Sequence, residues 1–150
     1  MKVVLFQPQI PQNTGNIARL CVASQTPLCL IKPLGFRLHS KEMKRAGLDY
    51  WEHLDLQVYP NFQAMQAEHR ANKCWFVSKK AQQIYTKVEY GTDDLLVFGA
   101  ETTGLPEEML EANPLNAVKI PMWGETRSLN LSSSVGIVLY EAYRQQGNFF

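Results

Sequence analysis

Six short apolar runs recur along this chain, and their alternation with polar, helix-forming stretches constrains the fold most strongly. The runs are apolar at nearly every position rather than at every second one, which indicates strands buried on both faces of a parallel sheet. The sequence therefore predicts an α/β fold, with a mainly parallel sheet and helices on both faces. The predicted strands are Lys2–Gln7, Leu28–Ile31, Leu56–Tyr59, Cys74–Ser78, Leu95–Phe98 and Ala117–Ile120.

The stretches between the runs carry helical signals. Asn13 is the predicted N-cap of the first helix, either Asn130 or Ser132 caps the last one, and Gly147 ends it. The length of 150 residues suits one core, so we expect residues 1–150 to form a single domain. The predicted helices are Thr14–Ser24, Asn61–Ala71, Pro106–Ala112 and Ser132–Gln146.

Composition excludes several classes of protein. The net charge is only +1, so any nucleic-acid surface must be a local patch. The N-terminal apolar run is too short for a signal peptide and no later run could span a bilayer, so we expect no membrane association. Three cysteines without a CxxC pair suit reduced thiols and a cytoplasmic location. The three histidines lack metal-ligand spacing, and we expect no metal site.

Three polar loops follow predicted strands and are chemically unusual. They read PQIPQNTGNIAR from Pro8, FGAETTGLP from Phe98 and IPMWGETRSLNLSSSVGIVLYE from Ile120, of which the last continues into the final predicted helix. Ligands of open parallel sheets bind at the carboxyl ends of the strands, where such loops gather. The second loop is not a P-loop, because it lacks the Lys and Ser/Thr, and it is not a dinucleotide-binding fingerprint, because it lacks the spacing GxGxxG. The serines of the third stretch lack the first glycine of GxSxG, so they do not form the nucleophile elbow of a hydrolase.

Arg19 and a separate cluster of basic residues each allow more than one interpretation. Asn16 and Arg19 are three apart and share a face of the first predicted helix. Arg19 is either a solvated surface residue or a group that binds phosphate, for which a guanidinium is well suited. A second cluster is either a solvated helix face or a contact for RNA phosphates, and it comprises Arg37, Lys41, Lys44 and Arg45.

The three loops together resemble the signature motifs of the SPOUT class of RNA methyltransferases. The matching segments are PQNTGNIAR, VFGAETTGLP and IPMWGETRSLNLSSSVGIVLYEA, in that order. The segment KRAGLDY, Lys44–Tyr50, narrows the resemblance to the small single-domain enzymes that methylate the ribose 2′-OH of the tRNA wobble nucleotide, cytidine or a modified uridine. The resemblance covers almost the whole chain and implies a C-terminal trefoil knot, which hydrophobic periodicity cannot predict.

The resemblance also implies roles for individual residues. Arg19 would act at the reacting end of the substrate and Asn130 would orient the ribose hydroxyl, so both are predicted catalytic residues. The partners would be a tRNA anticodon stem-loop, contacted by Asn16, Lys41, Lys44 and Arg45, and a second copy of the chain in a homodimer. S-adenosyl-L-methionine, without metal, would be bound by Val77, Gly99, Glu101, Gly104, Ile120, Ser128 and Leu129.

Two other functions remain open from the sequence. One is 2′-O-methylation of ribosomal RNA, and the other is a non-catalytic module that binds RNA or a nucleotide. Tyr140 and Tyr143 would either line the homodimer interface or cover the protomer's own core. The stretch Trp123-Gly124-Glu125 receives no role.

Overall fold

A single parallel sheet forms the centre of the molecule. The computed structural model describes residues 1–38, 41, 45 and 48–147. Within them, seven strands pair in the order β3-β2-β1-β6-β4-β7-β5, and every pairing is parallel. The strands are β1 Lys2–Phe6, β2 Leu28–Ile31, β3 Leu56–Tyr59, β4 Cys74–Val77, β5 Gln83–Ile84, β6 Leu95–Phe98 and β7 Ala117–Lys119.

The predicted strands are confirmed, and one strand was missed. β5 has only two residues, one of them polar, so it carries no apolar run that could reveal it. The helices and 3-10 turns are α1 Pro11–Ala23, η1 Leu48–His53, α3 Phe62–Glu68, η2 Tyr85–Lys87, α4 Glu107–Glu111, η3 Pro114–Asn116 and α5 Leu131–Gln145.

The start of the first helix differs from the prediction. α1 begins at Pro11, and the residue at its N-cap is Ile10 rather than Asn13. Proline favours the first turn because its φ is already helical and its missing N–H has no partner there. Asn13 therefore lies inside the helix, where its side chain is buried and free to make a tertiary contact.

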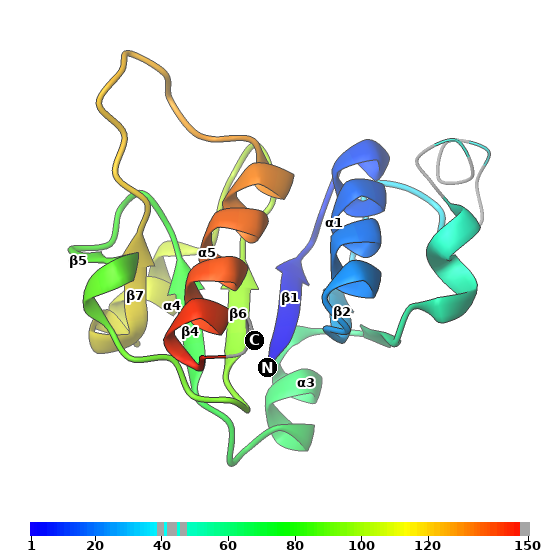
Figure 1. The fold of residues 1–150 in the computed structure, drawn as a ribbon. Coiled ribbons are helices and arrows are strands. Elements are labelled where there is room, and N and C mark those ends of the chain that lie inside the picture. Colours follow the sequence, from blue (N-terminus) through cyan, green and yellow to red (C-terminus); the bar gives the residue numbers. More distant parts are fainter. Residues whose placement is uncertain (39–40, 42–44, 46–47, 148–150) are drawn as a thin grey trace.

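Helices cover both faces of the sheet, as predicted. α1 and α5 lie side by side on one face, while α3 and α4 lie on the other (Figure 1). Successive strand residues point to opposite faces, so Val3 and Leu5 pack beneath α1 and α5 whereas Val4 packs toward α3. Burial on both faces explains why the strands are apolar at nearly every position.

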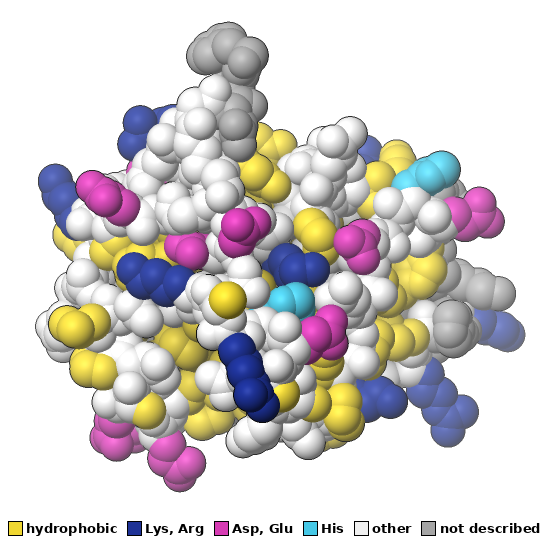
Figure 2. Space-filling view, turned by 90° about the horizontal axis from the view of Figure 1, so that it is seen from below, with side chains coloured by type: hydrophobic (Ala, Val, Ile, Leu, Met, Phe, Trp, Pro, Cys, Tyr) yellow, Lys and Arg dark blue, Asp and Glu magenta, His cyan; other side chains and the backbone are white. Residues whose placement is uncertain are grey.

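The two ends of the sheet differ in character. The strand arrows point to the upper edge in Figure 1, where α1 and α5 begin and the β7–α5 loop projects. Figure 2 views the opposite side, where the drawn basic and acidic side chains are interspersed among apolar ones. A ligand site is therefore expected at the carboxyl ends of the strands.

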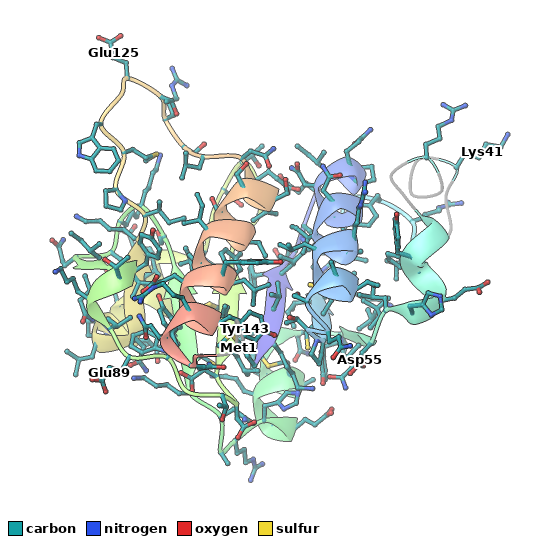
Figure 3. All side chains as sticks on the ribbon, viewed as in Figure 1. Met1, Lys41, Asp55, Glu89, Glu125 and Tyr143 are labelled. Atoms are coloured by element: carbon teal, nitrogen blue, oxygen red, sulfur yellow. The ribbon has the colours of Figure 1, made fainter. Side chains whose placement is uncertain are left out.

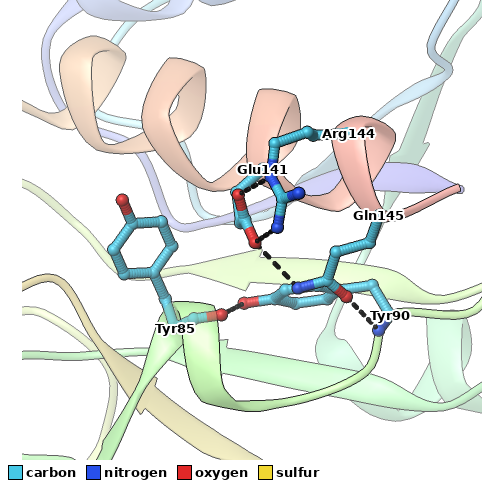
Figure 4. Close-up of polar contacts among 5 residues, drawn as sticks. All are labelled: Tyr85, Tyr90, Glu141, Arg144 and Gln145. Carbon is cyan, nitrogen blue, oxygen red and sulfur yellow. Dashed lines mark hydrogen bonds and ion pairs between the residues drawn. The ribbon is translucent and has the colours of Figure 1, made fainter. Parts of the chain in front are cut away.

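The C-terminal part of α5 is tied to the segment that leads into β6. The backbone N–H of Tyr90 donates to Oε1 of Gln145 over 3.1 Å, and the Tyr90 hydroxyl donates to the carbonyl of Tyr85 over 2.8 Å (Figure 4). The guanidinium of Arg144 pairs with Glu141 in the same cluster, at 2.8 Å. These contacts fix the end of α5 against the sheet.

The two tyrosines of α5 have different surroundings. The Tyr143 hydroxyl lies 2.6 Å from Oγ1 of Thr26, and the ring packs on the core beneath α1 and α5. Tyr140 is 43% exposed. Tyr143 therefore covers the protomer's own core.

Within the described residues, no helix combines the length and apolarity needed to cross a membrane.

Candidate active site

A pocket of about 620 Å³ opens at the carboxyl ends of the strands. It lies between the residues that follow β4, the loop after β6, the long connection from β7 to α5 and the start of α1. The structure thus brings the three motif loops together. Asn130 lines this pocket, and so do all seven residues predicted to bind the cofactor. These seven are Val77, Gly99, Glu101, Gly104, Ile120, Ser128 and Leu129.

The loop after β6 folds tightly onto itself. A Cβ atom on Gly99 would lie 2.2 Å from the carbonyl carbon of Gly104 and 2.3 Å from the nitrogen of Leu105. Gly104 has φ +69°, and its N–H donates to the carbonyl of Ala100 over 2.8 Å. The two glycines are therefore required by the loop's own close packing and left-handed turn.

The Glu101 side chain contacts the first motif loop. Its carboxylate accepts hydrogen bonds from the backbone N–H groups of Gln9, at 2.7 Å, and Ile10, at 3.0 Å. It also accepts one from Nδ2 of Asn13, at 3.2 Å. Glu101 thus holds the start of α1 against the loop after β6, and its oxygens are already used by protein donors.

Asn13 extends this contact to the third motif loop. Its Oδ1 accepts a hydrogen bond from Nδ2 of Asn130 over 2.9 Å. Oδ1 of Asn130 in turn accepts from the backbone N–H groups of Ser132, at 2.9 Å, and Ser133, at 3.3 Å. Asn130 is thus the N-cap of α5, one of the two caps predicted. The chain Glu101–Asn13–Asn130, here called the polar bridge, links all three motif loops.

Asn13 is a site residue that the sequence did not indicate. Its two partners lie 88 and 117 residues away along the chain. A local pattern contains no signal for such pairing, and within the same motif the resemblance implies roles only for Asn16 and Arg19. The only local hint was an asparagine at a helix start, which favoured a cap.

The predicted catalytic residue Arg19 and the described ones among the predicted RNA-contacting residues lie outside the pocket. Asn16 and Arg19 are exposed on α1 and do not line it. The Arg19 guanidinium lies over the ring of Tyr50, 5.3 Å from its centroid. Lys41 and Arg45 are exposed, Lys41 lies on the far side of α1 from the β7–α5 loop (Figure 3), and Lys44 lies outside the described residues.

The β7–α5 loop forms one wall of the pocket and projects beyond it. Nζ of Lys79 donates to the carbonyl of Arg127 over 2.9 Å, and the Thr126 hydroxyl donates to the carbonyl of Ser128 over 2.9 Å. Both contacts lie on the side of the loop that leads into α5. Glu125 stands at its outer tip (Figure 3).

The cysteines are neutral thiols. Burial raises the pKa of Cys21 to about 12 and the pKa of Cys29 and Cys74 to about 11. Each is free, and because a thiol is nucleophilic only as the thiolate, these residues are unsuited to covalent catalysis.

Among the described residues, no group of three or more His, Cys, Asp or Glu side chains is arranged to hold a metal ion.

Comparison with known proteins identifies the family. The model of the SpoU rRNA Methylase family matches residues 1–140. The chain belongs to the SpoU methylase family. A tRNA (cytidine(34)-2′-O)-methyltransferase of Methylovorus glucosotrophus is 46% identical over 144 residues, which cover 95% of this chain and 94% of that protein. The enzyme of the same name from Yersinia pestis is 42% identical, covering 98% of this chain and 94% of its own length.

Solved structures of SpoU methylases share the fold. One, described as giving structural insights into the 2-OH methylation of C/U34 on tRNA, has a TM-score of 0.93 at 46% identity and covers 98% of this chain and 96% of its own. The SpoU methyltransferase AviRb from Streptomyces viridochromogenes, in complex with the cofactor AdoMet, has a TM-score of 0.87 at 22% identity, covering 99% of this chain and 61% of that one. The predicted fold class is confirmed, and these SpoU neighbours imply the knot.

Proposed function

We propose that this protein transfers a methyl group from S-adenosyl-L-methionine to the ribose 2′-OH of nucleotide 34 of tRNA, a cytidine or a modified uridine. The observation that carries the proposal is the pocket at the carboxyl ends of the strands. All three motif loops line it, and the hydrogen bonds of the polar bridge connect these loops to one another.

The residues of the pocket suit this cofactor. A volume of about 620 Å³ falls within the usual range for small-ligand sites. The apolar side chains of Val77, Ile120 and Leu129 offer surfaces for an adenosine, while the peptide groups around Ser128 and Gly104 offer hydrogen bonds. When bound, S-adenosyl-L-methionine supplies an already activated methyl group, so the protein's main task is orientation. We propose that no metal takes part.

The chain's own residues divide the remaining tasks. A guanidinium offers hydrogen-bond donors and no acceptor, so Arg19 serves to stabilise negative charge on the attacking oxygen and to position a phosphate rather than to accept a proton. Asn130 has both ends of its amide engaged, by the α5 cap and by Asn13, so it orients the loop around the substrate hydroxyl. Asn16, Lys41, Lys44 and Arg45 are proposed contacts to the anticodon stem-loop.

A homodimer is part of the proposal. α5, which packs beside α1, exposes Ile137 and Tyr140, by 37% and 43%. Apolar and aromatic side chains are enriched at such interfaces. Arg19 lies outside the pocket of its own protomer, so α1 at a two-fold axis would place it near a second active site. Sedimentation at micromolar concentration tests this, and a fully active monomer would contradict it.

Ribosomal RNA is a less favoured substrate. An AdoMet-bound rRNA methyltransferase from Sinorhizobium meliloti is 26% identical, and this chain covers only 55% of it. The two relatives from Methylovorus glucosotrophus and Yersinia pestis, named for tRNA cytidine 34, are 46% and 42% identical, and each is covered over 94% of its length. A tRNA-modifying role and three reduced thiols also fit the proposed cytoplasmic location.

The decisive experiment uses tRNA from cells that lack this protein. Incubation with the purified protein and methyl-labelled S-adenosyl-L-methionine should place label on nucleotide 34 as a 2′-O-methyl group, found by nucleoside mapping. Calorimetry with S-adenosyl-L-homocysteine should show binding that survives a chelator. Binding of the tRNA without label transfer would instead support a non-catalytic module, and label found only in a parallel reaction with ribosomal RNA would support the other substrate.

A further inference from the structure

Trp123 is the most exposed of the large apolar side chains that the structure describes. It is 92% exposed on the projecting β7–α5 loop. Tryptophan is on average one of the more buried residues, because leaving its large ring in water is unfavourable. Packing of the protomer therefore gives no reason for a tryptophan at this position.

The place of Trp123 in the loop points to the substrate. Its neighbour Met122 lines the pocket, as do Arg127 and Ser128 on the returning side of the loop. Trp123 thus stands at the rim of the pocket and not in its wall. A large molecule that presents one group to the pocket must pass this rim.

Two cationic side chains at this rim can contact the phosphates of a polyanion. Lys79 and Arg127 are exposed there, and the Lys79 ammonium uses one of its three donors to hold the Arg127 carbonyl. The acidic groups are partly engaged, since Glu107 pairs with Lys80 at 3.3 Å and Glu101 accepts three N–H donors. Glu125 at the tip is the exposed carboxylate on the loop itself.

We propose that Trp123 is a stacking platform for a single-stranded base of the anticodon loop, next to the nucleotide whose ribose enters the pocket. The inference rests on the proposed function for the identity of the RNA. Bases in single-stranded loops are commonly splayed out and stacked on aromatic side chains, with nearby Lys and Arg at the backbone. Because every base has a π face, Trp123 would add affinity without selecting a sequence.

The first test measures methylation kinetics with an anticodon stem-loop. Stacking on one base is worth about 1–3 kcal/mol, or roughly a 5- to 150-fold change in affinity. Trp123→Ala should raise KM for the RNA within that range and leave kcat at saturating RNA unchanged, because the contact is made equally in ground and transition states. Trp123→Phe should retain most of the affinity, whereas Trp123→Leu should not.

The second test asks whether a base is the partner. Stem-loops that lack the base at position 33 or 35 remove one candidate each. If Trp123 stacks on that base, Trp123→Ala causes no further loss with that RNA, as in a double-mutant cycle. RNA should also quench the fluorescence of the wild-type protein but not of Trp123→Phe, in which Trp51 and Trp75 remain.

Matched controls distinguish base stacking from the general effect of removing an exposed apolar side chain. Leu115→Ala removes another such side chain, 81% exposed, at the amino end of β7, and should change neither KM nor quenching. Unchanged KM for Trp123→Ala would overturn the inference, and so would a shift of its sedimentation toward monomer, which would mean that a second copy covers the ring. If the wild type binds RNA with a quench due to Trp123 but transfers no methyl group, the proposed function fails while the stacking contact stands.

Discussion

Glu101 shows how one carboxylate at the pocket can hold two motif loops together. Two of its three N–H donors come from the segment that leads into α1 and the third from Asn13 in the first turn of the helix, so the carboxylate is hydrogen-bonded within the protein. Charge-assisted hydrogen bonds of this kind contribute about 1.5–3 kcal/mol. The residue is therefore expected to act on stability and on cofactor binding together.

Glu101→Gln tests that expectation. The amide keeps one acceptor oxygen but loses the charge and turns an NH₂ toward backbone donors. We expect a loss of about 1–2 kcal/mol, which corresponds to a fall in Tm of about 2–8 °C for a chain of this size, and weaker S-adenosyl-L-homocysteine binding. Thermal melts and calorimetry measure both. Glu125→Gln, at the exposed loop tip, is the control, and equal melts for the two variants would contradict the role assigned to Glu101.

Arg19 should affect chemistry and not cofactor binding. Because it lies outside the pocket, Arg19→Ala should leave S-adenosyl-L-homocysteine affinity within a few-fold while lowering the single-turnover rate about 100- to 1000-fold. Saturating tRNA removes binding defects from the comparison. Tyr50→Phe, which keeps the ring beneath the guanidinium, should stay active. A near-normal rate for Arg19→Ala would make it a docking residue.

Lys41 provides the contrast at the same scale. It is exposed beyond α1, where loss of one phosphate contact should weaken tRNA binding modestly and at all sequences alike. Lys41→Ala should also flatten the salt dependence of binding, with an unchanged single-turnover rate. Filter binding at several salt concentrations measures this, and an unchanged slope would remove Lys41 from the RNA surface.

Among the secondary-structure elements, α5 is held at both ends. Asn130 caps its start and bonds to Asn13, while Gln145 and Gln146 bond to Tyr90 and Gly91 at its end. The helix thus connects the pocket with the opposite edge of the sheet. Its placement depends on side chains that lie outside its own apolar stripe.

Two substitutions at Asn130 separate the cap from the polar bridge. Asn130→Ala loses both, and a lost N-cap alone costs about 1 kcal/mol. Asn130→Asp keeps an N-cap oxygen but cannot donate to Oδ1 of Asn13. We expect Asn130→Asp to be the more stable of the two in urea unfolding, yet to bind S-adenosyl-L-homocysteine more weakly than wild type. Wild-type affinity in Asn130→Asp would show that the bridge does not position the pocket.

The elements also show what local patterns can and cannot predict. Strand runs such as Leu95–Phe98 were visible because burial on both faces leaves a continuous apolar signal. The start of α1 was wrong because a proline at the first turn outweighed an asparagine two residues later. The pairing of Asn13 with Glu101 and Asn130 could not be predicted, since contacts across the fold leave no local period.

At the scale of the whole molecule, buried thiols should make stability depend on pH. Burial raises the pKa of Cys21 to about 12 and of Cys29 to about 11, whereas unfolded thiols titrate near 8.5. Above that value the unfolded chain releases protons that the folded chain retains, so stability falls as pH rises. Each thiol contributes a slope of up to about 1.4 kcal/mol per pH unit between pH 9 and 11.

Urea unfolding at pH 7.5 and pH 10 measures this loss. Tyr90, whose pKa is also raised by burial, adds to it at the upper end. Cys21→Ala should reduce the slope without removing it, because Cys29 remains. Equal stability at both pH values would show that the thiols ionise as readily in the folded state as in the unfolded chain.

The knot shows the limit of sequence reasoning for the whole molecule. Composition and apolar runs lead to an ordinary layered α/β domain, and only the motif resemblance implied a threaded chain. The positions of the predicted pocket residues followed from the same motifs, because each motif sits at the end of a parallel strand. The exposed placement of Arg19 did not follow, since a three-residue spacing gives a shared helix face but not what that face meets.

The polar bridge has a consequence for folding of the chain during its synthesis on the ribosome. Asn13 leaves the ribosome long before Asn130, which is 117 residues later, and α5 follows after that. A nascent chain therefore carries the first two motifs without the residue that closes the site. Contacts so distant in sequence form slowly, because a long loop must close first. The pocket should thus be assembled only after Asn130 has left the ribosome, so a chain stalled or truncated before that residue would be unable to methylate tRNA.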